Sequence, residues 1–340
     1  MTAGADGGNG MWSTLLHGGL AGSFMRAPVV PPQKEALEAA GAGAAIYGIP
    51  WDSTSISRTG ANYGPRGMRE ISCQFLTYCA TLGIDLSEQL PLVECGDAHI
   101  TLANAEKTFA AARADIEQIV EAGVLPVVIG GDHSVTIPAV RAVRAKHERP
   151  GLVLIDSHLD TATDVGGETL NHCCPISRAV DAGFDPAKIV LIGINGWLNP
   201  QAELAYAREH EITVIWLDEI WDEGVAPAIE RALAIASDGT DGIYLSFDID
   251  SLDAAYAPGT CVPTPGGLTA REAIELVRGV GAGGLLGLDV VEVAPSLDPT
   301  SQTASLGCRI ALEGLAAHAL AATAKTEAVL ADVAADLGNA

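Results

Sequence analysis

Histidine and aspartate side chains gather in three short segments of this sequence, and each segment follows or ends an apolar run typical of a buried strand. The segments are Gly130-Gly131-Asp132-His133-Ser134, Asp156-Ser157-His158-Leu159-Asp160 and Ser246-Phe247-Asp248-Ile249-Asp250. Strand ends that carry His and Asp supply ligands for divalent cations. The pattern therefore predicts a hydrolytic centre with two metal ions.

The spacing within these segments places the side chains on one side of the chain. An extended chain alternates its side chains with a period of two, so Asp156, His158 and Asp160 project the same way. The set offers four carboxylates and two imidazoles but no thiolate, which suits Mn(II) and also accepts Ni(II), Co(II), Fe(II) or Zn(II). We expect two divalent ions, Mn(II) or Ni(II), held by His133, Asp156, His158, Asp160, Asp248 and Asp250.

In this order, the three segments resemble the signatures of the ureohydrolases, the family of arginase and agmatinase. The resemblance covers most of the chain and continues through 58–67, 253–263, 266–269 and Glu292. Near the N-terminus, Gly22-Ser23-Phe24-Met25-Arg26 is similar to the opening arm of agmatinases and guanidinobutyrases rather than of arginases. The resemblance implies an arginase-like fold and, by analogy only, a homo- or hetero-oligomer, commonly a trimer or hexamer.

The resemblance also implies hydrolysis of a guanidinium group by metal-bound hydroxide. Two metals lower the pKa of water from about 15.7 towards 7, which supplies a strong nucleophile for a poorly electrophilic carbon. We expect Asp160 to accept a hydrogen bond from the hydroxide. By resemblance, Glu292 faces the guanidinium nitrogens, and His172 matches the histidine that carries a proton to the leaving amine.

Three segments depart from the family pattern where the family holds its substrate. They are His172-Cys173-Cys174-Pro175-Ile176, Gly259-Thr260-Cys261-Val262-Pro263 and Ile194-Asn195-Gly196-Trp197. The family pattern has a glycine directly after the histidine, and its replacement by Cys173 narrows the pocket. Val262 stands where the family pattern has a threonine, so it lacks the hydroxyl of that residue. We therefore expect retained chemistry with an altered substrate: a small or N-alkylated guanidine, an ω-guanidino acid, or a biguanide such as metformin, cleaved to guanylurea and dimethylamine.

Other functions stay open at this point. The chain is alternatively an agmatinase or guanidinobutyrase proper, or a subunit of a hetero-oligomeric ureohydrolase, although such a subunit usually loses metal ligands. A deacetylase-type amide hydrolase normally needs fewer ligands and a tyrosine near the reacting carbonyl, so the complete set of six speaks against it.

Composition limits the partners and the location. The chain has 19 Lys plus Arg against 43 Asp plus Glu, a net charge of −24, which repels nucleic acid and anionic membranes and attracts a cationic substrate. We expect a small cationic guanidine or biguanide as the partner. The seven cysteines show no Cys-x-x-Cys pairing, so a reducing cytoplasm fits best. No targeting or transmembrane segment is evident.

Apolar runs alternate with helical segments along the chain. We expect strands at 44–48, 125–129, 152–155, 189–192, 213–216, 243–246 and 285–290, helices at 103–122, 135–147, 200–209, 223–237 and 269–280, and one or two long helices after Gly307. This order predicts a three-layer α/β/α fold with a mostly parallel central sheet.

We expect an arm at 1–32, partly disordered and then extended, before one catalytic domain at 33–340. Asp97-Ala98-His99 matches the first half of the Asp-x-His-x-Asp pattern but lacks its second Asp. We therefore expect only a strand-to-loop turn at Gly96-Asp97.

Overall fold

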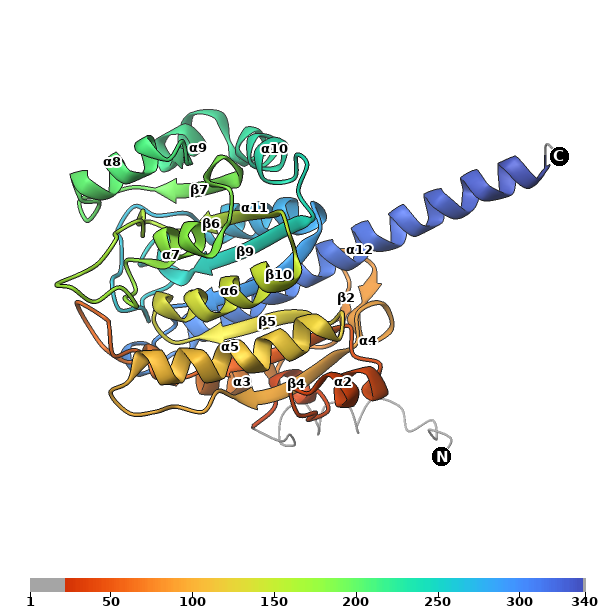
Figure 1. Ribbon diagram of the computed structural model, residues 1–340, viewed down its shortest axis with the longest axis horizontal. Coiled ribbons are helices and arrows are strands. Elements are labelled where there is room, and N and C mark those ends of the chain that lie inside the picture. The colour runs from red at the N-terminus through yellow and green to blue at the C-terminus, as the bar shows by residue number, and fades with distance from the viewer. Residues whose placement is uncertain (1–21, 339–340) are drawn as a thin grey trace.

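The computed structural model describes residues 22–338, with side chains as far as residue 325. Eight parallel strands form one sheet in the order β4-β1-β5-β10-β9-β6-β7-β8, and helices cover both of its faces (Figure 1). The predicted single-domain α/β architecture is confirmed. The strands are β1 (Ala44–Ile49), β4 (Leu92–Asp97), β5 (Leu125–Gly130), β6 (Pro150–Ile155), β7 (Ile189–Ile194), β8 (Thr213–Trp216), β9 (Gly242–Asp248) and β10 (Leu285–Val291).

Alternation of side chains along the strands divides the core into two halves. In β6, Val153 and Ile155 face one helical layer, and Leu152 and Leu154 face the other. The first layer contains α3 (Gly64–Ser72), α9 (Leu217–Glu223), α10 (Val225–Ala236), α11 (Ala270–Ala282) and α12 (Gln302–Gly338). The second contains α2 (Lys34–Ala40), α5 (Ala105–Glu121), α6 (Thr136–Lys146), α7 (Pro175–Ala182) and α8 (Gln201–Glu209). The short α4 (Leu86–Gln89) adjoins a hairpin of β2 (Tyr78–Cys79) and β3 (Ile84–Asp85).

All seven predicted strands are present, and the edge strand β4 is an addition. Its sequence contains a glutamate, a cysteine and a glycine, so it lacks a continuous apolar run; it ends at Asp97, as the expected turn requires. The five predicted helices correspond to α5, α6, α8, α10 and α11. The C-terminal stretch forms the single helix α12, which begins at Gln302, ahead of the predicted start. Helices α2, α3, α4, α7 and α9 were not predicted from the sequence.

The N-terminal arm is described only in part, because residues 1–21 lie outside the described residues. In the part that follows, Phe24 is buried in a short 3-10 turn rather than an extended segment. The backbone N–H of Phe24 donates to Glu94 (3.0 Å), and that of Met25 donates to Ser72 Oγ (2.7 Å). This part of the predicted arm is therefore packed on the body. Across residues 22–338, no helix has both the length and the apolar character to cross a membrane.

A buried ion pair joins α3 to the edge strand β4. Arg69 Nε and one terminal nitrogen donate to the two carboxylate oxygens of Glu94 (3.0 and 2.9 Å), and both side chains are buried. The same guanidinium donates to Asp97 (2.6 Å) and to the carbonyl of Gly96 (2.9 Å). This bidentate pair allows a strand with a central glutamate to stay in the sheet.

We predict that Arg69→Met lowers the free energy of unfolding by about 3–5 kcal/mol, because Glu94 is left buried without its partner. The matched control is Arg66→Met on the same helix, whose pair with Glu70 is exposed (2.9 Å) and contributes less than about 1 kcal/mol. Urea unfolding of both variants measures the difference. Equal losses in the two variants would contradict the structural role of the buried pair.

Candidate metal centre and active site

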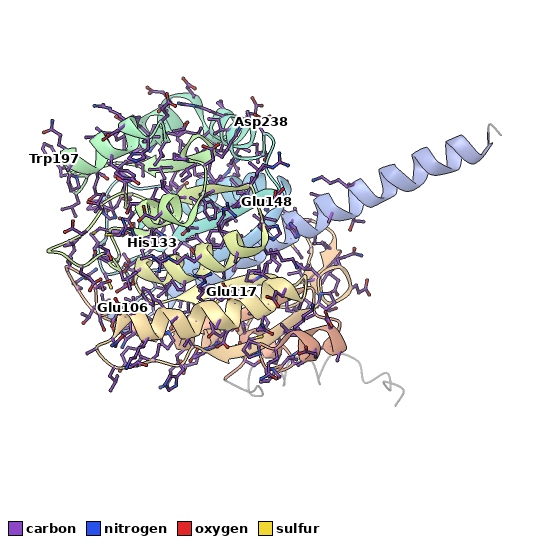
Figure 2. All side chains as sticks on the ribbon, viewed as in Figure 1. Glu106, Glu117, His133, Glu148, Trp197 and Asp238 are labelled. Carbon is purple, nitrogen blue, oxygen red and sulfur yellow. The ribbon has the colours of Figure 1, made fainter. Side chains whose placement is uncertain are left out.

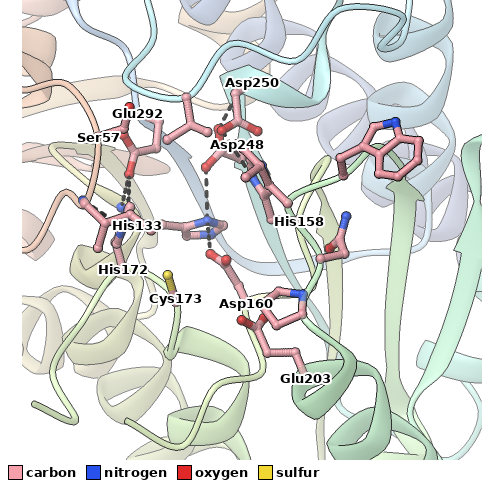
Figure 3. A pocket seen from close by; sticks show the side chains of 16 residues that line it. Ser57, His133, His158, Asp160, His172, Cys173, Glu203, Asp248, Asp250 and Glu292 are labelled. Carbon is pink, nitrogen blue, oxygen red and sulfur yellow. Dashed lines mark hydrogen bonds and ion pairs between the residues drawn. The ribbon is translucent and has the colours of Figure 1, made fainter. Parts of the chain in front are cut away.

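The six predicted metal-binding side chains lie together at the carboxyl end of the sheet. Strands β5, β10, β9 and β6 are consecutive in the sheet, and the signature segments follow β5, β9 and β6. Because parallel strands end at one edge, segments far apart in the sequence meet there. Figure 3 shows the side chains of His133, His158, Asp160, Asp248 and Asp250 around one cavity.

Two groups of ligand atoms share Asp156. His133 Nδ1 lies 3.2 Å from Asp156 Oδ2, 2.9 Å from Asp160 Oδ2 and 3.1 Å from Asp248 Oδ2. His158 Nδ1 lies 3.4 Å from Asp156 Oδ1 and 3.3 Å from Asp250 Oδ2. Each Asp156 oxygen faces a different imidazole, so the two groups of donor atoms meet at this carboxylate.

A buried relay fixes the tautomer of His133. Asp289 accepts hydrogen bonds from three hydroxyls, those of Ser246 (2.6 Å), Tyr244 (2.6 Å) and Thr136 (2.8 Å). Because the Ser246 proton is committed to Asp289, the Ser246 oxygen accepts from His133 Nε2 at 3.0 Å. In the neutral ring Nδ1 then has a lone pair that faces the carboxylates. Burial opposes a charge on this imidazole, but hydrogen bonds to Asp156, Asp160 and Asp248 outweigh it and raise the pKa of His133 well above its usual value. An imidazole oriented in this way is ready to bind a metal ion.

The centre contains more buried negative charge than its own side chains neutralise. His133 Nδ1, Asp156 Oδ2 and Asp250 Oδ1 are buried and, within the described part of the chain, have no hydrogen-bond partner. Burial, opposed by His158, raises the pKa of Asp250 to about 7. Burial and then the charges of Asp250 and Asp156 raise the pKa of Asp248 well above its usual range. Divalent cations would satisfy these lone pairs and relieve the repulsion, so the donor set fits two metal ions.

Asp160 and Glu292 both have left-handed backbone conformations, with φ of 50° and 62°. A residue with a Cβ adopts this conformation at a cost of about 1–3 kcal/mol. The surroundings hold it in place: the N–H of Glu292 donates to the carbonyl of Gly131 (2.8 Å), and the carbonyl of Asp160 accepts from Ile176 N–H (3.1 Å). Gly131 has to be glycine, since a Cβ there would collide with the carbonyl oxygen of Trp51.

His172 and Glu292 lie beside the metal ligands. Glu292 Oε1 accepts from the backbone N–H of His133 (2.9 Å) and from His172 Nδ1 (3.1 Å). Its other oxygen is buried and makes no hydrogen bond among the described residues, and the Cys261 thiol lies beside this carboxylate. His172 Nε2 accepts the backbone N–H of Ile56 (3.2 Å). Burial opposes a charge on His172, but Cys173 and Glu292 outweigh it and raise the pKa of His172 to about 11. A protonated Nε2 cannot accept the hydrogen bond from the backbone N–H of Ile56. The His172 imidazolium therefore forms only when Nε2 has moved away from that N–H.

A cavity of about 410 Å³ opens over the centre. Apolar side chains line its outer part: Ile56, Trp197, Leu198, Pro200 and Val262. Trp197 and Leu198 are exposed, and Trp197 projects from the surface of the molecule (Figure 2). No lysine or arginine is among the described residues that line the cavity. The cavity is therefore acidic at its base and apolar at its entrance.

The structure corrects the expectation that all the unusual cysteines line the substrate pocket. Cys173 and Val262 do line the cavity. Cys174 and Cys261 are fully buried and are not part of its lining. Cys261 packs with Ala61 and Ala294 instead. The side chains of neighbouring residues point in different directions, so a run of departures in the sequence does not form one surface.

Sequence reasoning missed Glu203, which lines the cavity from the first turn of α8. Its carboxylate accepts from the backbone N–H of Thr161 (3.3 Å), and burial followed by the charge of Asp160 raises its pKa to about 7. In the sequence it stands in an ordinary amphipathic helix, where a glutamate predicts a solvated face. Only the hydrogen bonds that join it to Thr161, in the loop after β6, reveal its position.

Comparison with known proteins gives the family. The model of the arginase family matches residues 42–316. The chain belongs to the arginase family. A mitochondrial agmatinase of Gallus gallus is 36% identical over 294 residues, which cover 86% of this chain and 84% of the relative. The chain is thus an arginase-family hydrolase with agmatinase-like relatives, as the sequence signatures indicated.

Solved structures agree with this family. The proclavaminate amidino hydrolase of Streptomyces clavuligerus superposes with a TM-score of 0.80 at 33% identity, covering 88% of this chain and 97% of that one. A Trypanosoma cruzi formiminoglutamase with Mn²⁺ superposes with a TM-score of 0.75 at 25% identity, covering 85% of this chain and 99% of that one. The arginase-like fold is thereby established for this chain.

We predict that Ser246→Ala weakens metal affinity by about 10–100-fold, because the relay from Asp289 no longer holds the His133 tautomer. Competition with a chelator of known affinity measures the change, and circular dichroism checks that the fold is kept. Ser251→Ala is the control, since Ser251 is also buried but bonds only the backbone carbonyl of Asp248 (2.7 Å). Unchanged affinity in Ser246→Ala would contradict the relay.

Proposed function

We propose that the protein is an amidinohydrolase with two divalent metal ions, Mn(II) or Ni(II), and that its substrate is a small N-alkylated guanidine or a biguanide such as metformin. Hydrolysis of a guanidine gives urea and an amine, and hydrolysis of metformin gives guanylurea and dimethylamine. The observation that carries the proposal is an acidic centre with six metal-ligand side chains below a cavity that is apolar and free of Lys and Arg among its described lining residues.

Two bound cations would lower the pKa of water and so supply a hydroxide nucleophile at neutral pH. The chain's own groups then have three roles. Asp160 accepts a hydrogen bond from the nucleophile, since its carboxylate reaches both the ligand group and the cavity. Glu292 pairs with the guanidinium through its free buried oxygen, as a planar carboxylate matches a planar cation.

His172 delivers the proton to the departing amine. The C–O bond forms first and makes the guanidinium carbon tetrahedral. When this intermediate collapses, the C–N bond breaks and its electron pair leaves with the amine, which must take up a proton. His172 lies on the cavity wall beside Glu292, which stabilises its cationic form. Entry of a substrate that displaces the Ile56 segment frees Nε2 for this transfer.

The cavity favours apolar substituents over an acid group. A guanidino acid would bring a carboxylate towards Glu203, and no lysine or arginine is among the described lining residues to receive it. Methyl groups, in contrast, would contact Val262 and the exposed Trp197 at the entrance. These contacts support dimethylated guanidines and biguanides as substrates.

Agmatine is the second candidate. The agmatinase relative supports it, and so does Glu203, whose carboxylate is available to an ammonium group in the cavity. A non-catalytic subunit is less well supported because every ligand side chain is present. The trimeric or hexameric state and the cytoplasmic location stay predictions.

The proposal is tested with the purified chain loaded separately with Mn(II) and Ni(II). The panel contains metformin, N,N-dimethylguanidine, agmatine, 4-guanidinobutyrate and arginine, with urea, guanylurea and dimethylamine as readouts. We expect kcat/KM to be highest for a dimethylated compound and lowest for 4-guanidinobutyrate. Efficient hydrolysis of agmatine alone would establish the second candidate, and a metal-loaded chain that hydrolyses none of them would overturn the proposal.

For His172 we predict that His172→Asn lowers kcat by about 10²–10⁴, the usual contribution of general acid catalysis, while both metals stay bound. Metal analysis of the purified variant distinguishes this role from ligation. If the variant loses metal, His172 belongs to the ligand set. If kcat is unchanged, another group protonates the amine.

For specificity we predict that Cys173→Gly combined with Val262→Thr shifts the kcat/KM ratio from the dimethylated substrate towards agmatine by about 10–200-fold. Both side chains line the cavity. Cys174→Ala is the control, because Cys174 is adjacent in sequence but buried outside the lining, so it should affect stability rather than the ratio. An equal shift in the control would show that general loosening, rather than direct contact, sets the preference.

A further inference from the structure

A second hollow with a different charge lies on the helical layer formed by α5, α6 and α7, which are neighbours in Figure 1. It has a volume of about 420 Å³ and shares no lining residue with the catalytic cavity. Arg113 of α5 and Arg141 and Arg144 of α6 line it, together with Ala145, Asp181 and Ala182. We call these three arginines, with Arg178 of α7, the arginine cluster.

The cluster has more positive charge than its partners neutralise. Arg113 pairs with Glu117 (2.7 Å), and Arg178 pairs with Asp181 (3.0 Å). The four guanidinium groups therefore have two paired carboxylates, in a chain whose net charge is −24. Four of the chain's 19 lysine and arginine residues gather in or beside this hollow, which gives it a local positive potential.

Two side chains of the cluster have N–H donors without an acceptor. Arg141 has no hydrogen-bond or ion-pair partner among the described residues, although it lies between neighbouring arginines. Burial and then the charges of Arg178 and Arg113 lower the pKa of Arg141. The Nε of Arg178 is buried and is likewise unsatisfied within the described chain. Arg144, in contrast, is anchored by the carbonyls of Gly183 (2.9 Å) and His147 (3.3 Å).

We propose that the arginine cluster is a binding site for a small polyvalent oxyanion of the phosphate type. An oxyanion in the hollow would accept from the free fork of Arg141 and offset the repulsion among the arginines, while the anchored Arg144 holds its charge in place. Guanidinium forks match phosphate oxygens in geometry as well as in charge. The site is separate from the catalytic centre, so it does not depend on the proposed reaction.

Titration of the metal-loaded protein with inorganic phosphate by calorimetry, at constant ionic strength with chloride as the competing salt, tests this site. The wild type should bind phosphate saturably at one site per chain. Arg141→Gln should raise the Kd by about tenfold, since one charge-assisted contact is lost. Arg113→Gln is a second variant with the same expected direction.

Arg271→Gln is the matched control, because it removes one positive charge from an exposed position of α11, which packs on the opposite face of the sheet from the cluster. Equal weakening by Arg271→Gln and Arg141→Gln would reduce the effect to net charge and overturn the proposal. Unchanged affinity in both cluster variants would place phosphate elsewhere, such as at the metal centre, and would also overturn it. The absence of phosphate binding, with a changed oligomeric mass in Arg141→Gln, would assign the cluster to a contact between copies.

Discussion

Concentrated negative charge at the carboxyl end of the sheet is the constraint on which the rest of this structure depends. Asp156, Asp160, Asp248 and Asp250 are all buried, and the two imidazoles of the site face them within about a hydrogen-bond distance. Without positive charge such an arrangement takes up protons, as the raised pKa of Asp250 indicates. The fold concentrates potential ligands at one edge, and divalent cations would neutralise their charge.

The surroundings maintain this arrangement at a cost in conformational energy. Two non-glycine residues at the site keep left-handed backbones, and a buried Asp289 is satisfied by hydroxyls rather than by a cation. Both features fix directions: the first aims the carboxylates of Asp160 and Glu292, and the second aims the lone pair of His133. A parallel sheet with well-packed faces is rigid enough to hold such strain.

The predicted ligands and the cavity entrance come from different parts of the fold. The predicted ligand side chains lie at or just after strand ends, whereas the entrance is formed by loops and by the start of α8. Loops tolerate changes that a strand end does not, because they are less constrained by sheet hydrogen bonds. Under the proposed function, substrate choice would therefore depend on entrance residues such as Val262 and Trp197.

The sequence by itself determined the seven apolar strands, five of the internal helices and the three segments whose histidines and aspartates meet at the carboxyl end of the sheet, because strand periodicity and strand-end residues are local signals. It did not reveal β4, whose glutamate is neutralised by Arg69 from a distant helix. Nor did it separate Cys173 from Cys174, identify Glu203 or assign the tautomer of His133. These three features depend on which side chains from remote segments meet, on how far water is excluded and on which acceptor each hydrogen-bond donor reaches. Only tertiary packing decides these things, since burial and charge neutralisation are properties of the assembled chain.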